Sequence, residues 1–151
     1  MLTIEQAQRS DVPDIVALLA DDFLGAGRER TGDDALQVYL AAFDAIDRDP
    51  NNTLYVARDS GLTVGCFQLT FVPGLSFGGR PRAQIESVRT LTSRRGQGIG
   101  QTMMAFAVAR AREHGCCLVQ LSTHKQRSDA HRFYERIGFV ASHEGMKLAL
   151  V

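Results

Sequence analysis

The sequence feature that most constrains the fold is a run with three glycines in six residues, Arg95-Gly96-Gln97-Gly98-Ile99-Gly100. The run follows an apolar segment at 83–91 that predicts a strand, and apolar residues at helical spacing come after it. Glycine lets the backbone approach a ligand without a Cβ in the way, and amide groups at a helix start attract phosphate oxygens. The run therefore predicts a phosphate-binding turn between a strand and a helix, with an unliganded helix start as the alternative.

The glycine run departs from two familiar nucleotide-binding patterns. Residue 101 is Gln where the pattern GxGxxG needs a third glycine, and no Gly-Lys-Ser or Gly-Lys-Thr sequence follows. The part that remains, Gln or Arg followed by x-x-Gly-x-Gly, begins at Arg95. Neither a dinucleotide fold nor a P-loop is therefore expected.

The other segments predict one α+β domain over residues 1–151. Alternating or β-branched residues predict strands at 2–8, 53–58, 62–72, 83–91 and 116–123, and one or two more within 139–151. Apolar residues three and four apart predict about four helices. These helices begin near residue 10, near residue 33, within 94–100 and at residue 128. The expectation is six or seven strands, with a strand–helix–strand crossover in the second half.

Composition excludes several classes of protein. The chain carries 17 Lys+Arg against 17 Asp+Glu, so its net charge of zero gives no field that would concentrate nucleic acid or an anionic membrane. No apolar run approaches the roughly 18 residues of a membrane span, and no signal-peptide pattern opens the chain. Three cysteines without CxxC, and four histidines without ligand spacing, predict reduced thiols and no metal site. We therefore expect a cytoplasmic protein.

A second motif lies downstream of the glycine run, at 129–139, and reads as helix, glycine stop and strand: Asp-Ala-His-Arg-Phe-Tyr-Glu-Arg-Ile-Gly-Phe. Together with Ile85-Glu86-Ser87-Val88 and the glycine run, it resembles the GNAT N-acetyltransferase superfamily over about 83–140. The stretch 121–143 is most similar to the aminoalkylphosphonate N-acetyltransferases. Two positions depart from the family pattern, because Arg127 stands where Asn is frequent and Thr92 where Pro is frequent.

The resemblance implies an α/β/α sandwich with a mixed, mostly antiparallel central sheet, and acetyl-CoA as co-substrate. It also implies a small-molecule amine as the partner, and it allows a homodimer. Backbone groups of Val88 and Thr90 would bind the pantetheine arm where two central strands splay, and the amides of the glycine run would bind the pyrophosphate. The implied acetyl-CoA contacts are Val88, Thr90, Arg95, Gly96, Gln97, Gly98, Ile99, Gly100, Ser122 and Arg127.

Tyr134 is the candidate general acid that the resemblance implies. A phenol with a pKa of about 10 is protonated at pH 7 and can give its proton to a departing thiolate. The alternative is that Tyr134 only packs beside Phe133 against the sheet. The sequence leaves both readings open.

Glu86 is the candidate general base, acting directly or through water. By strand alternation it is expected half-buried, on the same side of its strand as Val88 and Thr90. The alternative is a surface carboxylate that pairs with a nearby arginine. The resemblance places the acceptor pocket at the end of the first helix, where Asp21 and Asp22 either pair with a cationic amine or are solvated.

The predicted function is transfer of the acetyl group of acetyl-CoA to the primary amine of a small molecule, directly and in a ternary complex. An aminoalkylphosphonate-like molecule is the expected acceptor. Two alternatives stay open at this point: a non-catalytic acyl-CoA-binding regulatory module on the same fold, and an N-acetyltransferase that acts on proteins or peptides. Cofactor binding without turnover would indicate the regulatory module.

Overall fold

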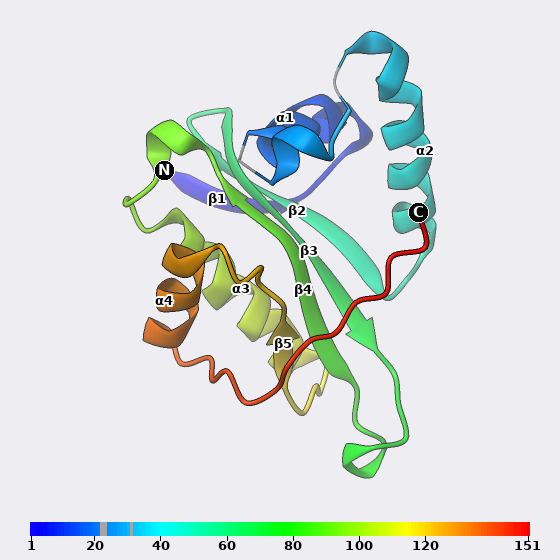
Figure 1. Cartoon of the computed structure of the whole chain (residues 1–151), viewed down its shortest axis with the longest axis vertical. Helices are drawn as coiled ribbons and strands as arrows, with labels where there is room; N and C mark the ends of the chain where they lie inside the picture. Colours follow the sequence, from blue (N-terminus) through cyan, green and yellow to red (C-terminus); the bar gives the residue numbers. More distant parts are fainter. Residues whose placement is uncertain (22–23, 31) are drawn as a thin grey trace. The chain divides into compact units, whose positions relative to one another are not determined.

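The computed structural model describes residues 1–21, 24–30 and 32–151 (Figure 1). The chain divides into two compact units, Met1–Gln120 and Leu121–Val151, and the assignment of the whole chain to one domain stays a prediction. The strands are β1 Leu2–Gln6, β2 Asn52–Asp59, β3 Leu62–Val72, β4 Arg82–Thr90 and β5 Val119–Leu121. The α-helices are α1 Val12–Ala20, α2 Asp33–Arg48, α3 Ile99–Glu113 and α4 Ser128–Arg136.

The strands form one sheet in the order β1-β2-β3-β4-β5, and the first three neighbouring pairs are antiparallel. Next to β4, the Cys117 N–H donates to the Pro81 carbonyl (2.9 Å) and the Ala83 N–H donates to the Leu118 carbonyl (3.0 Å). Both segments advance in the same direction across these bonds, so β5 lies parallel to β4. The predicted mixed, mostly antiparallel sheet is confirmed.

The predicted count of six or seven strands is wrong, since the described residues form five. The difference lies in residues 139–151, whose alternating pattern predicts strand but which form none. Alternation alone does not make a strand, because a strand also needs the hydrogen bonds of a neighbouring strand. The predicted set of about four helices is confirmed.

In the first unit, helices cover both faces of the sheet (Figure 1). Val56 of β2 and Cys66 of β3 pack among the buried residues of α1 and α2. The next residues along these strands, Tyr55 and Phe67, point to the opposite face, where Phe106 of α3 contacts both rings edge-on. The predicted α/β/α sandwich is confirmed.

One glycine sets how closely α3 approaches the sheet. A Cβ at Gly65 would lie 2.9 Å from Sδ of Met103 and 3.0 Å from the carbonyl oxygen of Arg89. A Cβ here would force the Met103 side chain and the Arg89 carbonyl to shift, so glycine at this position lets α3 lie close against β3. Because Gly65 pairs with Thr90, this close approach lies beside the end of β4.

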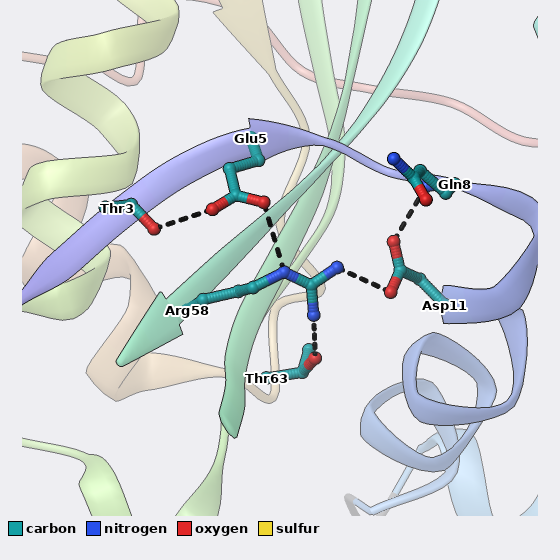
Figure 2. A network of polar contacts seen from close by, with 6 residues as sticks. All are labelled: Thr3, Glu5, Gln8, Asp11, Arg58 and Thr63. Carbon is teal, nitrogen blue, oxygen red and sulfur yellow. Dashed lines mark hydrogen bonds and ion pairs between the residues drawn. The ribbon is translucent and has the colours of Figure 1, made fainter. Parts of the chain in front are cut away.

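A polar network fixes the start of α1 against β1, β2 and β3 (Figure 2). Asp11 is 6% exposed, and one carboxylate oxygen accepts a hydrogen bond from Nη2 of Arg58 at 2.6 Å. Its other oxygen accepts the backbone N–H of Gln8 at 2.7 Å. Arg58 also donates to Glu5 (3.2 Å) and to the hydroxyl of Thr63 (3.0 Å). The hydrogen bond to Asp11 is the main cause that raises the pKa of Arg58.

The second unit contains α4 and the C-terminal segment that follows it. The helix ends next to Gly138, whose φ of +103° favours glycine. The Gly138 N–H donates to the carbonyl of Glu135 at 3.1 Å, and the Phe139 N–H donates to that of Tyr134 at 3.0 Å. The predicted glycine stop is thus present at the expected position.

Candidate active site

A β-bulge interrupts β4 at the segment that the sequence assigns to the active site. Gln68 pairs with Glu86, but Cys66, two residues earlier, pairs with Arg89, three residues later. One extra residue is therefore inserted into β4, and Ser87 adopts a φ of +57° there. The thiol of Cys66 donates to the Ser87 carbonyl at 3.6 Å. The bulge takes backbone groups out of the regular ladder, and the Val88 carbonyl there accepts a hydrogen bond from Nη1 of Arg89 at 2.8 Å.

The bulge also overturns the expected alternation along β4. Directly paired residues point to the same face of a sheet, so Glu86 and Arg89 lie on the face of Cys66, which α1 and α2 cover. Thr90 pairs with Gly65 and lies on the face of α3. The prediction that Glu86 shares a side with Thr90 is wrong, because the extra residue reverses the alternation. Glu86 is also exposed and not half-buried.

The end of β4 extends beyond its short neighbour. The side-chain amide of Gln120 donates to that of Gln84 at 2.8 Å, and β5 ends one residue later, at Leu121. β4 continues to Thr90, so residues 87–90 lie past the end of β5. In the described parts of the chain, no further strand covers this side of β4. Val88 and Thr90 therefore lie on a stretch of β4 that has no paired strand on this side.

The glycine turn connects this stretch to α3. Gly96 and Gly98 have φ values of +77° and +81°, and a Cβ on either would meet no atom within 4 Å. The first helical hydrogen bond is donated by Thr102 to the Gly98 carbonyl (3.0 Å). Across residues 1–21, 24–30 and 32–151, no backbone carbonyl and no capping side chain accepts from the amides of 96–100. These amides form a row of open donors at the positive end of a helix.

Two side chains hold the segment before the turn. The hydroxyl of Thr92 donates to the Asp21 carboxylate at 2.8 Å, a bond that proline could not make. Arg94 pairs with Asp59 at 2.7 Å, and the N-terminal ammonium of Met1 pairs with the other oxygen of Asp59 at 3.1 Å. The Arg94 hydrogen bond, followed by that of the ammonium group, lowers the pKa of Asp59. The turn is thus fixed to the end of α1 and to the β2–β3 hairpin.

The remaining residues around the turn are less constrained. Arg95 is exposed and makes no ion pair with a residue that the structure describes. Asp21, expected beside the acceptor, is exposed and already accepts from Thr92, while Asp22 lies outside the described residues. An acceptor contact of Asp21 stays a prediction.

The second unit carries the other sequence-predicted residues. On α4, the ring of Tyr134 contacts Phe133 and Phe139 edge-on, with ring centres 5.1 Å and 5.7 Å apart. Arg127 is the N-cap residue of α4, and Ser122 is exposed just after β5. The aromatic cluster fixes the Tyr134 ring, which both the catalytic and the packing reading of this residue require.

Three thiols are free, and they differ in accessibility. Cys66 is fully buried, and burial raises its pKa to about 12. Cys116 and Cys117 are partly buried. Burial raises the pKa of Cys116 as well, but a reagent can reach a partly buried sulfur. Because reaction needs both access and the thiolate form, we expect an alkylating reagent to label Cys116 and Cys117 in the native protein and to spare Cys66. Peptide mass spectrometry would show two labels under native conditions and three in urea; equal labelling of all three in the native state would contradict this prediction.

Within 1–21, 24–30 and 32–151, no three His, Cys, Asp or Glu side chains are grouped so that they could hold a metal ion. None of the helices described here is long and apolar enough to cross a membrane.

Comparisons with known proteins identify the class. The family model described as "Acetyltransferase (GNAT) family" matches residues 12–139. The chain belongs to this family and is an acetyl-CoA-dependent acyltransferase, so the resemblance seen in the sequence is confirmed. It is 36% identical over 107 residues to the aminoalkylphosphonate N-acetyltransferase of Salmonella typhimurium, a match that covers 71% of this chain and 69% of that protein.

Solved structures show the same fold. A transcriptional regulator from Bacillus halodurans C-125 is 48% identical, with a TM-score of 0.96 over 99% of this chain and 100% of that chain. A putative acetyltransferase from Agrobacterium tumefaciens C58 is 32% identical, with a TM-score of 0.83 over 97% of this chain and 99% of that one. The GNAT fold is therefore established by both sequence and structure.

Proposed function

We propose that this acetyltransferase moves the acetyl group of acetyl-CoA directly to the primary amine of a small, aminoalkylphosphonate-like molecule. The observation that carries the proposal is the bulged end of β4, which has no paired strand on one side and leads through a short turn into the open amides of residues 96–100. The name of the Salmonella relative supports the acceptor class. The three free thiols support a reducing, cytoplasmic setting.

The open amides fit the pyrophosphate of coenzyme A. The donors stand at the positive end of α3, and no Cβ obstructs an approach to Gly96 or Gly98. Arg95, exposed beside them, adds a positive charge for a phosphate oxygen. Along this side of β4, backbone groups of Val88 and Thr90 pair with the amides of the pantetheine arm, as an added strand would. Ser122 and Arg127 supply further contacts to the co-substrate.

The chemistry needs three events around one thioester, which acetyl-CoA supplies. Glu86, exposed on the face of α1 and α2, takes a proton from the amine, directly or through water. A backbone N–H of the bulge near Val88 donates to the carbonyl oxygen while negative charge grows on it. Tyr134 gives its proton to the sulfur as the carbon–sulfur bond breaks. The carbon–nitrogen bond forms, and an amide and a free thiol result.

The test is a panel of amines with acetyl-CoA, followed by mass spectrometry of the acetylated product. The panel contains aminoalkylphosphonates, aminoalkanes of equal length without the phosphonate, and peptides with a free amine. We expect turnover to be highest with the aminoalkylphosphonates. Turnover confined to peptides would favour a protein acetyltransferase. Coenzyme A binding by calorimetry without turnover of any amine would contradict the proposal.

A further inference from the structure

The two faces of the sheet differ in character along the halves of β3 and β4 that lead to the loop between them. Leu69 and Ile85, each 1% exposed, lie in the core on the face of α3. On the opposite face, α1 and α2 pack around Cys66. The residues of this face between Cys66 and the loop form a polar row: Gln68 and Thr70 of β3, and Arg82, Gln84 and Glu86 of β4. The polar row presents hydrogen-bonding groups and charge at positions where a sheet between helices is usually apolar.

Hydrogen bonds with neighbouring strands hold the uncharged members of the polar row in place. The Gln68 amide and the Thr70 hydroxyl both donate to the side-chain oxygen of Asn52 on β2, at 2.8 Å and 2.6 Å. The Gln84 side-chain oxygen accepts from the amide of Gln120 on β5. Polar networks of this kind make side chains rigid. The middle of the row is therefore a fixed polar surface that spans four strands.

The two charged members, Arg82 and Glu86, have opposite signs and stand four residues apart on β4. At about 3.3 Å per residue, this spacing separates their Cα atoms by about 13 Å. Nη2 of Arg82 lies 4.0 Å from the place that a Cβ would take on Gly74, so the guanidinium lies at the loop end of the row. In the part of the chain that the structure describes, neither residue makes an ion pair, whereas Arg58 and Arg94 do. The row therefore has a positive end and a negative end that do not neutralise each other.

We propose that Arg82 binds the anionic group of the acceptor while Glu86 faces its amine, with the acceptor's chain lying along Gln84. The inference rests on the proposed function, and it adds the residue that selects the anion. A guanidinium binds a phosphonate through paired charge-assisted hydrogen bonds that a neutral end group cannot form. Because the two charges stand at opposite ends of the row, the preferred acceptor carries its amine and its phosphonate at opposite ends, and not on one carbon. These three residues all belong to the first unit.

The first test compares kcat/KM of the full chain for 3-aminopropylphosphonate, for its isomer 1-aminopropylphosphonate and for propylamine. The unmodified enzyme is expected to prefer 3-aminopropylphosphonate to both other amines. Arg82→Gln should reduce the preference over propylamine by about 10–100-fold, the usual contribution of a hydrogen bond to a charged group, and mainly through KM. Arg82→Lys keeps the charge and loses the paired donors, so it should retain part of the preference. The matched control Arg80→Gln removes an equal charge from an exposed residue outside β4 and should keep the preference.

The second test needs no turnover, because calorimetry measures the Kd of 3-aminopropylphosphonate for the enzyme with coenzyme A present. Arg82→Gln should raise this Kd by the same 10–100-fold factor. An unchanged preference in Arg82→Gln, or an equal loss in Arg80→Gln, would overturn the role of Arg82 and leave the proposed function intact. Equal use of the two isomers would overturn the order of groups along the row.

Failure of the proposed function has a separate signature, since no amine of the panel would then be acetylated. The Kd still decides the role of Arg82 in that case. A weaker complex with Arg82→Gln and an unchanged one with Arg80→Gln would support it. The absence of binding to the unmodified enzyme, or equal binding to Arg82→Gln, would overturn it.

Discussion

Replacing Asp11 by alanine should lower the free energy of unfolding by about 3 kcal/mol, because losing the buried partner of an ion pair leaves the Arg58 charge with only the exposed Glu5 to balance it. Asp11 is 6% exposed, and its loss removes two hydrogen bonds, one from Arg58 and one from the Gln8 N–H. Arg58 keeps its hydrogen bonds to Glu5 and Thr63. The loss of stability is therefore expected at the lower end of the range for broken buried ion pairs. Urea unfolding measures the change, and the melting temperature should fall by roughly 6–12 °C.

The matched control is Asp44→Ala, which removes the partner of Arg9 in an exposed pair at 3.0 Å. Solvent screens that pair, so its loss should have a much smaller effect. In the double variant Asp11→Ala with Arg58→Met, the unpaired charge is gone, and part of the lost stability should return. If Asp11→Ala unfolds at the same urea concentration as Asp44→Ala, the buried network is not what fixes the start of α1.

The fold was predictable wherever local pattern and tertiary contact agree. The helix predicted to begin near residue 33 spans Asp33–Arg48, and the strand predicted at 62–72 spans Leu62–Val72. In both elements, the spacing of the apolar residues that predicts the helix or strand also places those residues on the face that is buried. The predicted strand at 116–123 shrinks to Val119–Leu121, because a strand extends only as far as its hydrogen bonds to a neighbour, and β5 has one neighbour, β4. Residues 139–151 show the same dependence in full, because alternation alone provides no partner.

The sequence was enough to predict which residues form the candidate site, but not how the backbone arranges them. The glycine run indicated a turn with open amides, and the structure has both because Gly96 and Gly98 adopt the conformations that glycine permits. No feature of the sequence indicates the bulge. Ser87 is an ordinary strand residue, and it adopts a positive φ only because of the register between β3 and β4. Sequence reasoning therefore missed Ser87 and the thiol of Cys66 that contacts its carbonyl.

Tyr134→Phe should lower kcat by about 10²–10⁴-fold, the usual contribution of a positioned general acid. Phenylalanine preserves the edge-on contacts with Phe133 and Phe139, so the ring stays in place and only the hydroxyl is lost. Binding of coenzyme A, measured by calorimetry, should not change. A general acid must be protonated to act, so kcat of the unmodified enzyme should fall as the pH rises above the pKa of the phenol. The Tyr134→Phe variant should lack this alkaline limb, the fall of kcat at high pH.

Tyr55→Phe is the matched control for loss of a hydroxyl. Tyr55 lies in β2 and stacks on Phe67 with ring centres 5.1 Å apart, within the core of the first unit. Its variant should keep kcat and the full pH profile. A Tyr134→Phe enzyme with unchanged kcat would assign Tyr134 to packing alone, and an effect confined to KM for the amine would make it a binding residue. Only a loss of kcat together with the alkaline limb assigns the proton transfer to Tyr134, because packing does not titrate.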